Sequence, residues 1–189
     1  MNIRAQPIIE DRITRLFSVA DVKAMVAAGI MAEDERVELI EGVLVEMAAK
    51  NRSHELIKNW IVEQAILKGA GEYRVSVEGT LYLADETFVE PDILFHGPGT
   101  VVTDVKGPQT LLAIEVADAS LRYDLGRKAQ IYATYGVREL WVIDATRRET
   151  HVHLRASVNG YATVDIFDAD FEVRPKSVPN FTMRLSEVA

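Results

Sequence analysis

Two acidic residues stand beside apolar runs, where a carboxylate costs free energy unless it is paired or bound to a cation. Asp92 opens the apolar run 93–95, and Glu115 closes the apolar run 111–114. Glu38 interrupts another β-rich run near the start of the chain. If the strands that carry Asp92 and Glu115 are neighbours, their carboxylates meet at one point of a sheet. The other interpretation is that these acids simply face water, and that Glu38 points outward from a hairpin.

Carboxylates that meet in this way form a hard oxygen site, which suits Mg²⁺, with Mn²⁺ as a second candidate. The backbone carbonyl of Val116 is a further candidate ligand, because it directly follows Glu115. We therefore expect Asp92, Glu115 and Val116 to bind the metal ion.

A lysine follows on the next predicted element, a helix over 123–135. Asp124, Lys128 and Tyr132 share one face of that helix, because four residues make about one helical turn. Lys128 can then reach back to the carboxylates, where an ammonium group can orient a water or neutralise phosphate charge. The alternative is an Asp124–Lys128 pair on the surface, with Tyr132 in the core.

The predicted secondary structure starts with a helix over 19–28, for which Ser18 and Asp21 have capping-box spacing. A hairpin with a Glu41-Gly42 turn follows, and Ser53 can cap a second helix that ends near Gly69. Alternating or apolar runs then predict strands at 73–77, 81–83, 93–95, 111–114 and 140–143, and a final β region from 152 to 166.

The order strand, helix, strand over 111–143 predicts one βαβ crossover, and the remaining strands predict mixed or antiparallel pairing. We therefore expect an α/β fold (α+β by another convention) with a mixed central β-sheet flanked by a few helices.

The chain has 189 residues, 48% of them hydrophobic, which is enough for one sizeable core. We expect an N-terminal arm over 1–17 and a single domain over 18–189. The chain has no cysteine, which excludes disulfides and thiolate metal sites and agrees with a reducing cytoplasm. No apolar run is long enough to predict a signal peptide or a membrane span. The net charge of −8 argues against a protein that merely coats nucleic acid, although 121–155 is a basic stretch.

Six stretches occur in an order that resembles the PD-(D/E)XK nuclease superfamily, and most closely its Uma-type restriction-endonuclease family. The resemblance covers roughly 18–187, and the stretches are 36–42, 89–93, 112–116, 127–128 with Tyr132, 136–144 and 179–181. Each stretch alone is common, but the ordered set is fairly specific.

The resemblance implies a restriction-endonuclease-like fold and Mg²⁺-dependent hydrolysis of phosphodiester bonds in DNA. By position, Asp92 and Glu115 match the metal-binding acids, and Glu38 matches a third acid that completes the site. The family signature places a lysine two residues after the second acid, where this chain has Ala117. Lys128 matches a lysine relocated to the following helix. His54 also matches a family histidine, for which we favour a helix-capping or packing role.

The resemblance further implies DNA as the partner. We expect its backbone to be held by Arg122, Arg127, Arg147 and Arg148. A homodimer would supply two sites for two strands. Double-stranded, single-stranded and branched DNA all remain open as substrates, as does RNA.

Three other functions stay open. The missing lysine at Ala117 fits a catalytically degenerate nuclease fold that acts as a nucleic-acid-binding or regulatory module. A two-carboxylate glycosidase would need exposed aromatic side chains, whereas Trp60 and Trp141 both lie in apolar patterns typical of a core. A structural or interaction module would leave the acids as ordinary surface groups.

Overall fold

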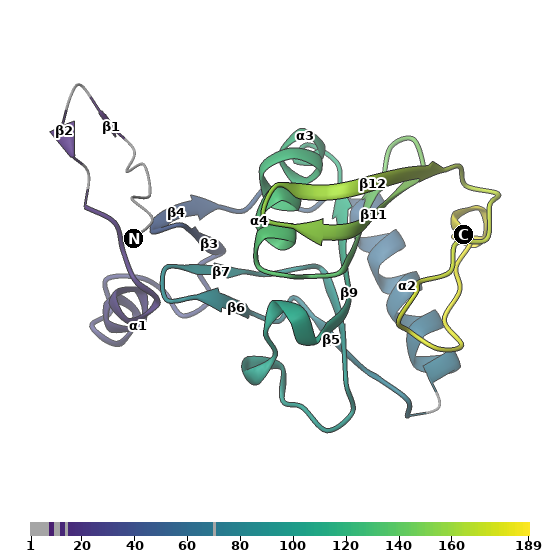
Figure 1. Ribbon diagram of the computed structural model, residues 1–189, viewed down its shortest axis with the longest axis horizontal. Coiled ribbons are helices and arrows are strands. Elements are labelled where there is room, and N and C mark those ends of the chain that lie inside the picture. Colours follow the sequence, from purple (N-terminus) through teal and green to yellow (C-terminus); the bar gives the residue numbers. More distant parts are fainter. Residues whose placement is uncertain (1–7, 10–11, 14, 70) are drawn as a thin grey trace. The chain divides into compact units, whose positions relative to one another are not determined.

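The computed structural model describes residues 8–9, 12–13, 15–69 and 71–189 (Figure 1). Most of the expected arm over 1–17 lies outside the described residues. The chain divides into two compact units, Met1–Met47 with Ala84–Val89, and Ala48–Leu83 with Glu90–Ala189. We expected a single domain over 18–189, and this expectation stays a prediction.

The first unit starts with two short paired strands, β1 (Ile8–Ile9) and β2 (Arg12–Ile13). Helix α1 (Val19–Ala27) follows, and its capping box is confirmed. The Ser18 hydroxyl accepts from the Asp21 amide at 3.1 Å, and Asp21 accepts from the Ser18 amide at 2.8 Å. These bonds satisfy backbone N–H groups that have no partner inside the helix.

The predicted hairpin is also present, as β3 (Val37–Ile40) paired antiparallel with β4 (Val43–Glu46). Glu41 and Gly42 both have positive φ angles, 50° and 85°, as a two-residue turn of this kind requires. Strand β7 (Thr87–Val89), which the sequence patterns did not predict, pairs with β3 through Leu39 and Phe88. All four residues of β3 are buried, so Glu38 does not point outward into solvent.

The second unit is built on a six-stranded mixed sheet in the order β12-β11-β10-β9-β8-β5. Its strands are β5 (Arg74–Val77), β8 (Ile93–His96), β9 (Thr110–Ala117), β10 (Glu139–Asp144), β11 (Glu149–Ser157) and β12 (Gly160–Phe167). Strands β9 and β10 are parallel, and each other neighbouring pair is antiparallel. The predicted βαβ crossover and the mixed sheet are therefore confirmed. Strand β6 (Leu81–Ala84) lies at the end of the smaller sheet, in the order β4-β3-β7-β6.

Helix α2 (Arg52–Gly69) lies along one face of the six-stranded sheet (Figure 1). Ile57, Ile61 and Ala65 recur once per turn, and they pack on Ile114 and Trp141 of the sheet. The expected cap at Ser53 is wrong by two positions. The Asn51 side chain accepts from the His54 amide at 2.9 Å, because the helix already begins at Arg52.

The closing segment of the chain covers the same face beside α2 (Figure 1). Phe181 is fully buried, with its ring centroid 5.0 Å from that of Phe95 and 6.2 Å from that of Trp141. Lys68 on α2 donates to the Thr182 carbonyl at 2.8 Å. Burial of Trp141 and partial burial of Trp60 agree with the core role expected for both.

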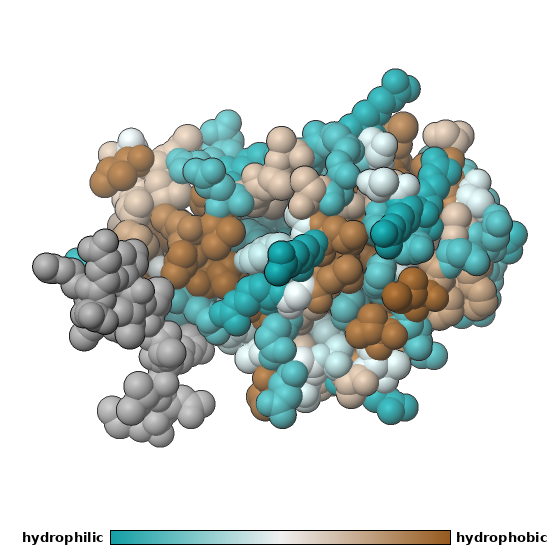
Figure 2. Space-filling model, turned by 90° about the horizontal axis from the view of Figure 1, so that it is seen from above, coloured by the Kyte–Doolittle hydropathy of each residue, from teal (hydrophilic) through white to brown (hydrophobic). Residues whose placement is uncertain are grey.

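The third predicted helix is a continuous helical run with a π-helical turn inside it. It consists of α3 (Leu121–Tyr123), the π-turn η3 (Asp124–Lys128) and α4 (Ala129–Thr134). Short 3-10 turns lie at Val102–Asp104, Gly107–Gln109 and Leu185–Glu187. Among the described residues, no helix is long and apolar enough to cross a membrane. In Figure 2 the hydrophobic surface residues form separate areas between hydrophilic ones.

Candidate active site

Asp92 and Glu115 lie at the same end of two neighbouring strands, β8 and β9. The antiparallel register pairs Ile93 with Ile114, so Asp92 directly precedes one member of this pair and Glu115 directly follows the other. Asp92 is 5% exposed and Glu115 is 4% exposed. The structure thus brings together two buried acids that lie far apart in the sequence.

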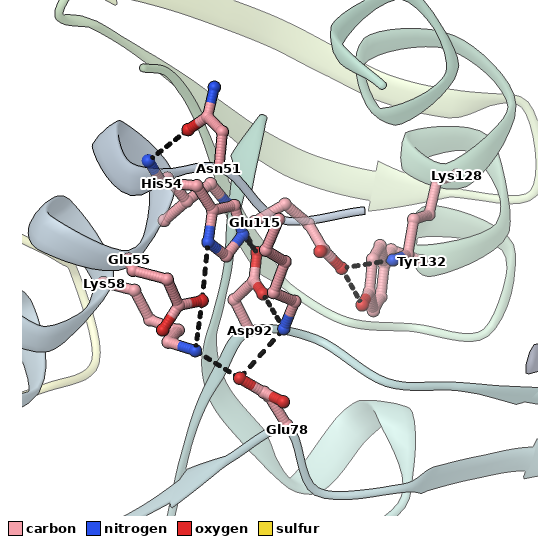
Figure 3. A network of polar contacts seen from close by, with 11 residues as sticks. Asn51, His54, Glu55, Lys58, Glu78, Asp92, Glu115, Lys128 and Tyr132 are labelled. Carbon is pink, nitrogen blue, oxygen red and sulfur yellow. Dashed lines mark hydrogen bonds and ion pairs between the residues drawn. The ribbon is translucent and has the colours of Figure 1, made fainter. Parts of the chain in front are cut away.

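Asp92 is held by donors from three segments (Figure 3). Its Oδ2 atom lies 3.0 Å from His54 Nε2 and accepts from the Val116 amide at 2.8 Å. Its Oδ1 atom lies 3.0 Å from Lys50 Nζ. Burial by itself raises the pKa of Asp92, but the hydrogen bond from His54, the His54 and Lys50 charges and the Val116 amide outweigh it. The pKa of Asp92 is lowered to about 2, so the carboxylate is ionised at neutral pH.

Glu115 is held from the helix that follows it. Lys128 Nζ lies 3.0 Å from Glu115 Oε1, and the Tyr132 hydroxyl donates to the same oxygen at 2.5 Å. Glu115 alternates along β9 with Ile114 and Val116, which pack against α2, so it projects from the opposite face. Figure 3 shows Lys128 and Tyr132 approaching Glu115 side by side.

The π-turn η3 ends at Lys128, directly before α4. Single π-turns inside α-helices are rare and often occur at functional sites. Lys128 is 4% exposed and Asp124 is 5% exposed, so the surface pair considered for these residues is wrong. Tyr132 is buried, as its core interpretation requires, and it also hydrogen-bonds to Glu115.

Four further residues join Asp92 in a network that the sequence patterns did not reveal. They are Lys50, Glu55, Lys58 and Glu78, with Lys50 Nζ lying 2.9 Å from Glu78 Oε1 and Lys58 Nζ 2.9 Å from Glu55 Oε1. Lys58 also contacts Glu78. Glu55 and Lys58 lie within one turn of α2, which was the only local signal that pointed to this network.

His54 lies between two carboxylates, which makes the expected helix-capping or packing role incomplete. Besides the contact with Asp92, its Nδ1 atom lies 3.2 Å from Glu55 Oε1. The cap of α2 comes from Asn51 instead, and Asn51 also donates to Asp118 in the loop after β9. His54 therefore belongs to the candidate site.

The other predicted site residues are placed as follows. Val116 donates its amide to Asp92, as described above. Glu38 is buried on β3 of the first unit, and its membership in the site stays a prediction. Arg122, Arg127, Arg147 and Arg148 are exposed on the second unit.

Comparison with known proteins identifies the family and the fold of the chain. A family model described as "Putative restriction endonuclease" matches residues 21–186. No curated protein sequence gives a significant match. A solved structure from Anabaena variabilis, described as a putative nuclease belonging to DUF820, is similar with a TM-score of 0.71 at 16% sequence identity. The match covers 91% of this chain and 97% of that one. At this identity the likeness shows the fold, which is restriction-endonuclease-like. Because the family model spans most of the chain, the chain belongs to the Uma2 family of restriction-endonuclease-like nucleases.

Proposed function

We propose that this chain is a Mg²⁺-dependent endonuclease that hydrolyses phosphodiester bonds in DNA, with Asp92 and Glu115 as its metal-binding acids. One observation carries the proposal. Two buried carboxylates adjoin the Ile93–Ile114 pair of two neighbouring strands, and each has a lysine ammonium group 3.0 Å away. Buried acids arranged in this way are expensive for folding, and they are typical of sites that use them chemically.

The donors suit a hard divalent cation. Mg²⁺ usually takes one or two carboxylates and keeps several waters, so it does not need a complete cage of protein ligands. The ionised state of Asp92 also favours cation binding.

The Val116 carbonyl is the third proposed ligand, and the strand geometry supports it. The Ala145 amide donates to the Ala117 carbonyl, so the main chain of Ala117 faces β10 and that of Val116 faces β8. The Val116 main chain therefore lies beside the Asp92 carboxylate, to which its amide donates.

The chain's own residues then have separate roles in hydrolysis. The metal ion supplies Lewis acidity, which makes a bound water easier to deprotonate. Lys128 either orients the attacking water or neutralises charge on the phosphate, and its position beside Glu115 serves both roles. Tyr132 keeps Glu115 in one orientation through its hydroxyl. Glu38 is the third acid of the proposed site by its match to the family.

DNA binding is proposed to use the exposed arginines, Arg122, Arg127, Arg147 and Arg148. Contacts of this kind reach the phosphate backbone and position DNA without reading its sequence. DNA affinity should therefore fall steeply as the salt concentration rises. We also propose a homodimer, because cutting both strands calls for two sites, and light scattering during gel filtration measures its mass.

The test is cleavage of plasmid DNA and short single-stranded DNA with Mg²⁺ or Mn²⁺, with EDTA as the metal-free control. Wild type is compared with Asp92→Asn, Glu115→Gln, Glu38→Gln and Lys128→Ala. Asp165→Asn and Lys106→Ala serve as matched controls, because both residues are exposed and neither belongs to the site. We expect metal-dependent cleavage that the four site variants lose and the two controls keep. Cleavage that survives Asp92→Asn and Glu115→Gln would rule out these acids as the metal site.

A second candidate function is a nucleic-acid-binding or regulatory module on a catalytically degenerate nuclease fold. The specific observation in its favour is Ala117, which is fully buried at the position where the family signature has a lysine. Under this alternative, the protein binds Mn²⁺ and DNA in titrations, yet wild type leaves both DNA substrates intact.

A further inference from the structure

Six ionisable side chains, one of them Asp92, form a closed ring of polar contacts. Contacts of 2.9–3.2 Å, and one shorter contact between Lys58 and Glu78, run from Asp92 through His54, Glu55, Lys58, Glu78 and Lys50 and back to Asp92. Carboxylates alternate with nitrogen bases around the whole ring. Figure 3 shows the labelled members of the ring, with dashed lines marking the contacts between neighbours. Every carboxylate of the ring contacts two basic groups. One of these groups can therefore move toward a neighbouring carboxylate while the first carboxylate keeps its other basic partner.

The two oxygens of Asp92 are held in different ways. Oδ2 accepts from the Val116 amide and contacts His54, and both of these groups belong to regular elements, β9 and α2. Oδ1 contacts Lys50, whose long side chain extends from the segment before α2. Oδ2 is thus anchored, whereas the partner of Oδ1 can move by rotating side-chain bonds.

Lys50 is a partly buried cation that is shared between two acids. Its side chain is 13% exposed, and its Nζ atom lies 3.0 Å from Asp92 Oδ1 and 2.9 Å from Glu78 Oε1. Both contacts are ion pairs, and the contact with Lys50 is among those that lower the pKa of Glu78. The ammonium group is therefore attracted by both carboxylates at once.

Glu78 is fixed in place as the second partner of Lys50. Its φ angle is 52°, a left-handed conformation that glutamate rarely adopts. Its backbone N–H donates to the Asp92 carbonyl at 3.1 Å, which ties the two acids together. Strained backbone of this kind persists where the surrounding structure enforces it, often at functional sites.

We propose that Lys50 is a built-in counter-ion of the metal site. It occupies Asp92 Oδ1 in the metal-free protein, and it moves to Glu78 when a divalent cation binds Asp92. This inference rests on the proposed function, because it takes Asp92 as a metal ligand. Two cations repel each other at one carboxylate oxygen, so binding of the metal requires Lys50 to leave. Glu78 already lies within contact distance and receives it.

The proposal makes Lys50 a determinant of metal affinity. Without the metal, Lys50 compensates the charge of a buried carboxylate that would otherwise cost folding free energy. With the metal, the same ammonium group competes for Asp92 and weakens binding. Glu78 reduces this competition by offering Lys50 another acid.

The test is calorimetric titration of the full chain with Mn²⁺, in the absence of DNA, for wild type, Lys50→Met, Lys58→Met and Glu78→Gln. We expect Lys50→Met to bind Mn²⁺ about tenfold more tightly, a coupling of ordinary size for two linked sites. Lys58→Met is the matched control, because Lys58 is in the same ring and contacts Glu55 and Glu78 without contacting Asp92. The Mn²⁺ affinity of Lys58→Met should rise clearly less than that of Lys50→Met. Glu78→Gln should bind Mn²⁺ more weakly than wild type, because Lys50 then has only Asp92.

An unchanged or weaker affinity in Lys50→Met, or an equal gain in Lys58→Met, overturns the proposal. Binding that appears only in Lys50→Met supports it, and absence of binding in wild type and Lys50→Met alike overturns it. If Lys50→Met does not fold, Lys50→Gln repeats the test with a neutral polar side chain, and circular dichroism checks folding of each variant. The outcome is separable from nuclease activity. If Lys50→Met binds Mn²⁺ more tightly but wild type does not cleave DNA, the counter-ion role of Lys50 is supported and the proposed nuclease function is refuted. If wild type cleaves DNA but Lys50→Met does not bind Mn²⁺ more tightly, the nuclease function is supported and the counter-ion role is refuted.

Discussion

His54 Nε2 on α2 lies 3.0 Å from Oδ2 of Asp92, at the start of β8. The contact fixes one oxygen of the proposed metal ligand through a residue that does not itself bind the metal. Replacing such an outer partner of a metal ligand typically lowers metal affinity about 10- to 100-fold. His54 is accordingly a positioning residue of the proposed site.

We therefore expect His54→Ala to weaken Mn²⁺ binding at least about tenfold in calorimetry. His54→Gln should recover part of the loss, because its amide can still donate to Asp92. His96→Gln is the matched control, since His96 is also buried but contacts Ser76 and the Gly97 carbonyl. Equal losses in His54→Ala and His96→Gln would show that the effect is a general consequence of removing a buried histidine.

Tyr132→Phe tests the hydrogen bond that orients Glu115. A hydrogen bond to a charged group contributes about 1.5–3 kcal/mol, so the free energy of unfolding should fall by about 2 kcal/mol in urea denaturation. DNA cleavage should fall as well, because Glu115 keeps Lys128 but loses the hydrogen bond from the Tyr132 hydroxyl. Tyr161→Phe removes a hydroxyl bonded to the Val137 carbonyl, away from the acids, and should keep its cleavage activity. The role of Tyr132 is refuted if its variant cuts DNA as fast as wild type.

Acid should destabilise the metal-free protein through Asp92. Its pKa is about 2 in the folded chain and 3.8 as a reference for the unfolded chain, so the folded state favours the ionised form. The stabilisation is complete above about pH 4, amounts to about 2 kcal/mol, and is lost as the pH falls through 2. Urea denaturation in EDTA at a series of pH values measures it. Asp92→Asn should flatten this part of the curve, whereas the exposed Asp165→Asn should leave the curve unchanged.

A second pH effect should occur at higher pH through His153. Burial, and to a lesser extent the charge of His151, lowers the pKa of His153 to about 4, from a reference of 6.5. Below pH 6.5 the unfolded chain takes up a proton that the folded chain does not. The free energy of unfolding should therefore fall by about 3 kcal/mol between pH 7 and pH 4. His153→Gln should lose most of this dependence, and a steep slope that persists in the variant would assign it to other groups.

Local sequence patterns predicted the elements well where neighbouring residues decide the structure. The Ser18–Asp21 capping box, the Glu41-Gly42 turn and the apolar runs before and after the candidate acids all act over a few residues. Their physical causes are hydrogen bonds to backbone groups, allowed φ angles and the alternation of side chains along a strand. Strand β7 was missed because its three residues are too few for a period to show.

Local sequence patterns could not predict contacts between segments that lie far apart in the chain. The ordered motifs marked Asp92, Glu115 and Lys128, but only the pairing of β8 with β9 brought together the segments that carry the two acids. Only the π-turn and the packing of α4 brought Lys128 to Glu115. Lys50 and Glu78 had no signal at all, since neither lies in a pattern and their link to Asp92 depends on where the chain places two separate connections. Short-range chemistry in the sequence was enough to predict most of the elements, and the ordered motifs were enough to indicate the family and the acids to consider. The tertiary structure decided which bases surround the acids, because that depends on side chains that meet only after the chain has folded.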